Sequence, residues 1–315
     1  MKKKTLGIIG PGYHFEKNII WSLKKSNSFK ITGILRNKKK KYKNYETLNE
    51  AEFFKKKFDF IYISCPNKLH EKYIIKSLRS YSNVICEKPF ITSHKKINEI
   101  ILLSKKNKKL IFEAFMYLYH PVFSILKKII KDKKRGKLRY IISNFRFPSL
   151  DKKNQRYKKH LGGGFFYDAA VYLISLENYL FNNISLNKKD LEKLTISKNV
   201  DLRGYFTIKN KNFKRFYFWG EGQNYTNNLE LFFKNSSIYI DRFYSKLKNK
   251  PILIKIFENK KVKIIKIKKY EDQFTNMFNE IKQNYNKISF QKYHKIPVLN
   301  YDVKLNYILT EKGIR

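Results

Sequence analysis

Residues able to do chemistry stand where short apolar runs of the chain end. Glu87-Lys88-Pro89 closes one run, and Cys65-Pro66-Asn67, followed by His70, closes another. A lysine fixed between Glu87 and Pro89 at a strand end is held on a rigid element, so it could act as a positioned cation. The alternative is that Lys88 is one more surface charge in a lysine-rich chain.

A glycine-containing turn follows the first apolar run, Thr5–Ile9, and opens a helical pattern. Gly10 permits a tight turn there, and Gly12 would let a pyrophosphate approach the main chain at the positive helix N-terminus. Phe15 stands where a dinucleotide-binding turn usually has a third small residue. The alternative is a strand-to-helix turn that binds nothing.

The end of the second apolar run carries Arg36-Asn37 in place of an acidic residue. A carboxylate at this point would bind a ribose 2′-hydroxyl, whereas Arg36 would favour a 2′-phosphate. The other interpretation is that Arg36 begins a lysine-rich surface loop.

The elements that must position these residues alternate between strand and helix over the first part of the chain. Short apolar runs separated by helix-period segments predict parallel strands with crossover helices. The carboxyl ends of such strands share one edge of the sheet, where open parallel sheets bind ligands. The expected strands are Thr5–Ile9, Lys30–Leu35, Asp59–Ser64, Asn83–Glu87 and Leu110–Ala114.

The pattern changes in the second half of the chain. A helix over Val122–Lys131, a strand over Leu138–Phe147 and a helix over Gly164–Leu180 are followed by closely spaced strands, which predict an antiparallel sheet. The strands are Leu202–Ile208, Lys214–Trp219, Asn228–Phe233, Ser237–Asp241, Ile252–Phe257 and Val262–Ile267, and a last helix covers Asp272–Tyr285. We therefore expect an α/β chain with a doubly wound parallel sheet in residues 1–118 and an α+β domain, with a large mostly antiparallel sheet, in residues 119–315.

The net charge of +44 raises the question of a polyanionic partner. Only ten of the 69 basic residues are Arg, and the lysines are spread from Lys2 to Lys312. A codon-biased surface therefore explains the charge without specific nucleic-acid binding. The two cysteines fit neither a disulfide framework nor a metal-binding spacing. We expect no metal and no membrane partner, and a cytoplasmic location, because no signal peptide or apolar span is recognisable.

Several motifs occur together in an order that resembles one family. They are Gly10-x-Gly12, Cys65-Pro66-Asn67 with His70, Glu87-Lys88-Pro89, Glu113-Ala114-Phe115-Met116-Tyr117 with His120-Pro121, and Gly162-Gly163-Gly164 with Asp168 and Tyr172. This set resembles the glucose–fructose oxidoreductase / inositol dehydrogenase (Gfo/Idh/MocA) family. The looser motifs around Arg156, Tyr225 and Asn228 resemble its nucleotide-sugar 3-ketoreductases.

The resemblance implies a Rossmann domain and a nicotinamide-dependent oxidoreductase that acts on a sugar carbonyl or hydroxyl. It makes Lys88, Asp168 and Tyr172 the catalytic residues, with Tyr172 exchanging the proton. The implied cofactor contacts are Gly10, Gly12, Tyr13, Arg36, Asn37, Cys65, Pro66, Asn67, His70, Glu87 and Lys88, with NADP(H) favoured over NAD(H) because of Arg36. The implied substrate contacts are Tyr117, Arg156, Tyr225 and Asn228, and the C-terminal sheet is expected to form a homo-oligomer.

Two other functions remain open at this stage. One is a basic protein that binds nucleic acid or another polyanion and keeps the fold without catalysis, and the other is a dehydrogenase of free sugars or polyols. Tyr172 could equally be a core aromatic residue on the inner face of its helix.

Overall fold

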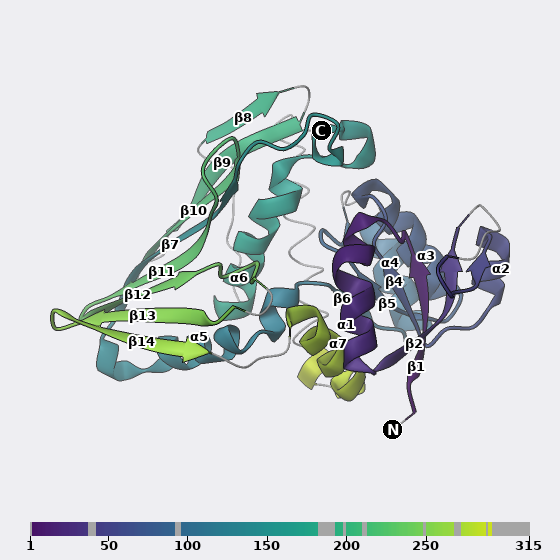
Figure 1. Cartoon of the computed structure of the whole chain (residues 1–315), viewed down its shortest axis with the longest axis horizontal. Coiled ribbons are helices and arrows are strands. Elements are labelled where there is room, and N and C mark those ends of the chain that lie inside the picture. The colour runs from purple at the N-terminus through teal and green to yellow at the C-terminus, as the bar shows by residue number, and fades with distance from the viewer. Residues whose placement is uncertain are drawn as a thin grey trace. The chain divides into compact units, whose positions relative to one another are not determined.

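The computed structural model describes residues 2–36, 42–91, 96–181, 193–197, 200–209, 213–247, 250–267, 272–287 and 289–291. These residues form two compact units (Figure 1). Unit 1 holds the chain up to Met116, residues His160–Gly162 and the helix that begins near Phe274. Unit 2 holds Tyr117–Lys159 and the chain from Gly163 to Gln273.

Unit 1 is built on a six-stranded sheet in the order β3-β2-β1-β4-β5-β6, with every neighbouring pair parallel. The strands are β1 (Lys4–Ile9), β2 (Phe29–Leu35), β3 (Thr47–Leu48), β4 (Phe60–Ile63), β5 (Asn83–Cys86) and β6 (Ile111–Glu113). The expected doubly wound sheet is confirmed. The prediction missed β3 and the helix α2 (Glu50–Lys55), because two residues are too few to show a strand period.

Helices cover both faces of this sheet because its central strands are apolar on both sides. Ile61 and Ile63 of β4 face a core that includes residues of α3 (His70–Arg79) and α4 (Ile97–Lys106). Tyr62, which points the other way, contacts Phe278 of α7 (Gln273–Asn284). Helix α1 (Ile20–Ser26) lies on that second face, where the Ser22 carbonyl accepts a hydrogen bond from Thr275 of α7.

Helix α7 belongs to unit 1, although it follows the last strand of unit 2. Its buried residues Phe274, Met277, Phe278 and Ile281 repeat with a helical period and give it one apolar stripe. That stripe packs on the face of the unit 1 sheet to which Tyr62 points, where Phe278 also contacts Phe29 of β2. The two units therefore differ from the ranges 1–118 and 119–315 expected from the sequence, since the chain returns to unit 1.

Unit 2 contains an eight-stranded sheet in the order β14-β13-β12-β11-β7-β10-β9-β8. All neighbours are antiparallel except β7 and β10, which are parallel, so the expected mostly antiparallel sheet is confirmed. The strands are β7 (Leu138–Phe147), β8 (Lys193–Ser197), β9 (Val200–Lys209), β10 (Lys214–Glu221), β11 (Thr226–Phe233), β12 (Ser236–Asp241), β13 (Ile252–Glu258) and β14 (Lys261–Ile267). Strand β8 was not predicted.

Two helices accompany this sheet. Helix α5 (Pro121–Lys131) begins with a proline in its first turn, and the His120 ring accepts a hydrogen bond from the Val122 amide. Helix α6 (Val171–Phe181) lies against one face of the sheet (Figure 1). Alternate strand residues, such as Ser143 and Phe145 of β7, point towards this helix and form the inner face of the sheet.

Candidate active site

The turn after β1 brings two loops of unit 1 into close contact. Gly10 has φ +78°, and a Cβ added there would lie 2.4 Å from the Cys65 amide nitrogen, so only glycine fits. A Cβ added at Gly12 would meet nothing within 4 Å. The space on the Cβ side of Gly12 is therefore free for a pyrophosphate. The Gly12 amide itself donates to the Gly10 carbonyl at 2.8 Å, so the fit to a dinucleotide rests on the helix N-terminus that follows this turn.

The Cys65–Asn67 loop is held from inside the unit. Asn67 Nδ2 donates to the Gly162 carbonyl at 3.1 Å. His70 is fully buried, with Nδ1 2.8 Å from the Pro89 carbonyl and Nε2 2.9 Å from the Cys65 carbonyl. Its side chain faces main-chain groups of this chain, so its position indicates a structural link between two loops rather than the predicted direct cofactor contact. Burial lowers the pKa of His70.

Glu87 links the Lys88 turn to the glycine turn. Its carboxylate accepts hydrogen bonds from the Tyr62 hydroxyl and, at 3.1 Å, from His14 Nε2. Burial by itself would raise the pKa of Glu87, but His14, Tyr62 and the nearby Lys88 outweigh it and the pKa is lowered. The predicted cofactor residue Glu87 is thus an ionised anchor, and the sequence analysis missed its partners His14 and Tyr62.

Glu113 is a second buried carboxyl beside the same turn, and the sequence analysis gave it no role of its own. It ends β6, where it pairs with Cys86, and Oε1 accepts a hydrogen bond from the Phe90 amide at 2.9 Å. Its Oε2 is buried without a hydrogen-bond partner among the described residues. Burial raises the pKa of Glu113 to about 8 even though the Phe90 amide and Lys88 favour its charged form. No periodicity or spacing distinguishes such a residue in a sequence.

Arg36 and Tyr13, two further predicted cofactor residues, are exposed at the same edge of unit 1. The Arg36 guanidinium lies over the ring of Tyr42 at 5.0 Å, and the Tyr42 hydroxyl bonds Glu16 and the Pro11 carbonyl. Tyr13 is 76% exposed. The predicted residue Asn37 lies outside the described part of the chain.

In unit 2 the predicted residues Asp168 and Arg156 form an ion pair. Arg156 Nε and Nη2 donate to the two oxygens of Asp168 at 2.6 and 3.0 Å, and Asp168 raises the pKa of Arg156 despite its burial. Asp168 lies in a wide π-type turn, Phe166–Ala170, at the start of α6. Such turns are frequent at functional sites.

Asp201 of β9 caps that turn, and the sequence analysis also missed it. Its carboxylate accepts a hydrogen bond from the Phe166 amide. A Cβ added at Gly164, where φ is +118°, would lie 2.4 Å from Asp201 Oδ1, which explains the glycine. Burial raises the pKa of Asp201 to about 7.

Tyr172 lies in an aromatic cluster on the inner face of the sheet. Its ring centroid is 5.2 Å from that of Phe145, 5.8 Å from Tyr244 and 5.9 Å from Tyr117, and only 4% of the residue is exposed. The Tyr117 and Ser175 hydroxyl groups form a hydrogen bond of 2.8 Å. The arrangement fits a positioned hydroxyl and also the core aromatic residue considered above.

The remaining predicted substrate residues, Tyr225 and Asn228, lie just before β11 and within it. Side chains along this strand alternate between the two faces of the sheet. Asn227 points to the inner face, where its Oδ1 accepts from the Tyr244 amide, so Asn228 points to the opposite face. There Asn228 bonds Asn144 and Glu230. This position argues against a direct role for Asn228 beside Tyr172. Tyr225 is 40% exposed under the Arg242 guanidinium.

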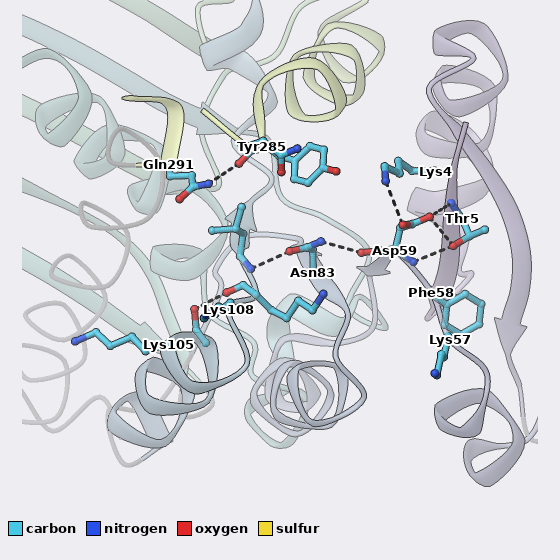
Figure 2. Close-up of a pocket in the computed structure, with 14 residues that line it drawn as sticks. Lys4, Thr5, Lys57, Phe58, Asp59, Asn83, Lys105, Lys108, Tyr285 and Gln291 are labelled. Atoms are coloured by element: carbon cyan, nitrogen blue, oxygen red, sulfur yellow. Dashed lines mark hydrogen bonds and ion pairs between the residues drawn. The ribbon is translucent and has the colours of Figure 1, made fainter. Parts of the chain in front are cut away.

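A cavity of about 830 Å³ in unit 1 is lined by none of these residues (Figure 2). It opens at the amino ends of β1, β4 and β5, near Thr5, Asp59 and Asn83, whereas the glycine turn and Lys88 follow the carboxyl ends. Asp59 is held there by Lys4 and Thr5. The cavity is therefore not part of the candidate site.

Two broader properties concern the described residues alone. No helix among them is long and apolar enough to cross a membrane. None of their His, Cys, Asp and Glu side chains gather in groups of three or more that could hold a metal ion.

The parallel sheet of unit 1, with the glycine turn and the Lys88 turn at its carboxyl edge, is the arrangement of an oxidoreductase with an NAD-binding Rossmann domain. Residues 4–115 match the family described as "Oxidoreductase family, NAD-binding Rossmann fold", and residues 123–220 match the "GFO/IDH/MocA C-terminal domain". The chain belongs to the Gfo/Idh/MocA family, which confirms the resemblance.

Curated relatives match part of the chain. A dTDP-3,4-didehydro-2,6-dideoxy-alpha-D-glucose 3-reductase of Actinomadura kijaniata is 28% identical over 116 residues, which are 37% of this chain and 35% of that protein. A trans-1,2-dihydrobenzene-1,2-diol dehydrogenase of Xenopus laevis is 27% identical over 143 residues, which are 45% of this chain and 42% of that protein. The matched segments thus span less than half of either relative.

Solved structures match nearly the whole chain. KijD10, a 3-ketoreductase from Actinomadura kijaniata in complex with NADP and TDP-benzene, has a TM-score of 0.82 at 18% identity and covers 97% of this chain and 95% of that one. An aldose-aldose oxidoreductase from Caulobacter crescentus has a TM-score of 0.81 at 16% identity and covers 99% and 98%. At these identities the likeness establishes the fold.

Proposed function

We propose that this chain is an NADP(H)-dependent oxidoreductase that reduces, or in reverse oxidises, a keto sugar, with a nucleotide-linked 3-keto sugar as the substrate class. The observation that carries the proposal is the Lys88 turn. It is anchored through Glu87 to the glycine turn at the carboxyl edge of a parallel sheet, in a member of an oxidoreductase family. The curated 3-ketoreductase relative supports the substrate class.

When bound, the nicotinamide supplies or accepts the hydride. The helix N-terminus that follows Gly12 would hold the pyrophosphate, and the Cys65–Asn67 loop lies against Gly10. Lys88 places a cation beside the oxygen of the reacting carbon and stabilises the negative charge that develops there. These are roles that residues of unit 1 can fill.

Residues of unit 2 handle the proton. In the reductive direction the Tyr172 hydroxyl donates its proton to the sugar oxygen and recovers one from solvent, so that one hydride and one proton convert the carbonyl to an alcohol. Asp168, held by Nε and Nη2 of Arg156, is an acceptor that orients the polar groups around Tyr172. Arg156 is therefore a positioning residue for Asp168, and its own charge is neutralised by that pair.

Arg36 supports the preference for NADP(H). Its exposed guanidinium follows β2 and lies over the Tyr42 ring at 5.0 Å, and a guanidinium at this strand end can bind a 2′-phosphate through two of its nitrogens. The Tyr42 hydroxyl donates a hydrogen bond to the nearby Glu16 carboxylate.

The outer face of the unit 2 sheet supports the proposed homo-oligomer. Tyr140 and Phe232 stack on it at 4.4 Å, and Leu253, Phe257, Val262 and Ile264 are each more than a third exposed. Exposed apolar groups of this kind on a sheet favour association with a second copy. Cys65 and Cys86 form no disulfide, which agrees with the proposed cytoplasmic location.

A direct assay tests the function. NADPH oxidation is followed by absorbance with dTDP-3,4-didehydro-2,6-dideoxy-alpha-D-glucose, with a free keto sugar and inositol as comparison substrates. We expect turnover with the nucleotide-linked sugar. Turnover only with the free substrates would favour the sugar or polyol dehydrogenase, and thermal stabilisation by duplex DNA without stabilisation by either dinucleotide would favour the polyanion-binding protein.

A further inference from the structure

Two buried side chains hold the main chain immediately after Lys88 from opposite sides. The Pro89 carbonyl lies 2.8 Å from His70 Nδ1, and the Phe90 amide donates to Glu113 Oε1 at 2.9 Å. His70 comes from α3 and Glu113 from the end of β6, so the two contacts tie the turn to different elements of unit 1. His70 is 0% exposed and Glu113 is 3% exposed.

These contacts leave Lys88 between two fixed points. On one side the Glu87 carboxylate is held by Tyr62 and His14. On the other side the Pro89 carbonyl and the Phe90 amide are held by His70 and Glu113. A side chain placed between such anchors keeps one main-chain position, which a positioned cation needs because a displacement of about 1 Å can cost about 100-fold in rate.

We propose that His70 and Glu113 are positioning residues that fix the Lys88 turn for hydride transfer. The inference rests on the proposed function, because it assigns to both residues the placement of the cation used there. Neither side chain needs to touch cofactor or substrate. With its proton on Nδ1, the neutral His70 ring donates to the Pro89 carbonyl, and the Glu113 carboxyl accepts from the Phe90 amide, so both residues act through the main chain that follows Lys88.

The chemistry of each contact selects the variants. Glu113→Gln keeps an oxygen that can accept from the Phe90 amide, whereas Glu113→Ala removes it. An asparagine at position 70 places its amide N–H near the site of Nδ1 and can still reach the Pro89 carbonyl. A glutamine reaches the site of Nε2 and keeps only the Cys65 contact.

Hydrogen exchange measures how well the Phe90 amide is protected, and it needs no substrate. In peptides that contain Phe90, we expect Glu113→Ala to exchange roughly 10-fold faster than the wild type, the scale of one lost hydrogen bond, while Glu113→Gln stays close to the wild type. If Glu113→Ala does not fold, Glu113→Asp, which is one methylene shorter, replaces it.

Steady-state kinetics then read the consequence. We expect Glu113→Ala to lower kcat by roughly 10- to 100-fold with an almost unchanged KM for NADPH, Glu113→Gln to recover most of it, and His70→Asn to retain more kcat than His70→Gln. Unchanged exchange and kcat in Glu113→Ala, or a more active His70→Gln, would overturn the inference. An inactive wild type would instead refute the proposed function. The exchange result would still show whether Glu113 holds the Phe90 amide.

Discussion

The Lys88 turn of unit 1 and the Tyr172 helix of unit 2 are held by different forces. Lys88 is flanked by polar contacts: His14 donates to the Glu87 carboxylate, the His70 ring contacts the Pro89 carbonyl, and the Phe90 amide donates to Glu113. Tyr172 is held by rings, with Phe145, Tyr117 and Tyr244 around it, and by the turn that Asp201 caps. Directional bonds can place a mobile lysine, whereas a rigid aromatic ring needs only packing to define its position.

The largest expected effect compares the two proposed catalytic groups directly. Lys88→Ala and Tyr172→Phe should each lower kcat by about 100-fold or more, because each removes a positioned charge or proton donor. NADPH affinity, measured by calorimetry, should change far less. Tyr244→Phe is the control in the same aromatic cluster, and a Tyr172→Phe enzyme with wild-type turnover would make Tyr172 a core residue alone.

The cofactor edge of unit 1 offers the next test. Calorimetry should show tighter binding of NADPH than of NADH, and Arg36→Asp should erase or reverse this preference, a change of about 10-fold for one charge-assisted contact to phosphate. Lys30→Asp, at the other end of β2, controls for the change in net charge. Tighter binding of NADH by the unmutated protein would contradict the role given to Arg36.

Removal of the cap in unit 2 should act on stability before it acts on chemistry. Asp201→Ala leaves the Phe166 amide without its acceptor, so we expect a loss of about 1–3 kcal/mol in the free energy of unfolding. Asp201→Asn, which keeps an acceptor, should lose less. The midpoint of urea unfolding measures both, and equal midpoints for the wild type and Asp201→Ala would remove Asp201 from the support of the Asp168 turn.

The buried carboxyl of unit 1 should make the smallest difference, visible as a dependence on pH. Burial raises the pKa of Glu113 from 4.5 to about 8, so between these two pH values the carboxyl keeps its proton in the folded chain and loses it in the unfolded chain. The unfolded state then binds fewer protons, and stability should fall as pH rises, by at most roughly 1.4 kcal/mol per pH unit. Thermal unfolding of Glu113→Gln should show a shallower decline, and an identical slope in both proteins would mean that Glu113 is already ionised at neutral pH.

Sequence patterns were sufficient for the elements with a strong period. Five of the six parallel strands of unit 1, the strand Leu138–Phe147 and the antiparallel strands after Val200 follow from short apolar runs and their spacing, since burial on one or two faces leaves that pattern in a sequence. The tight turn expected at Gly10 is also present, with φ +78°. The order of the motifs identified the family before any contact was known.

Other features depended on residues that meet only in the folded chain. His70 contacts the Pro89 carbonyl, Glu113 the Phe90 amide and Asp201 the Phe166 amide across 19, 23 and 35 positions. A single buried polar residue carries no period, so nothing near it in the sequence announces its partner. The face of Asn228 and the return of α7 to unit 1 were decided in the same way, by strand register and by which apolar surface was left to cover. The sequence by itself determined which elements form and which motifs end them, and the tertiary structure decided which buried groups hold those motifs in place, because hydrogen bonding between distant segments is a property of the packed fold.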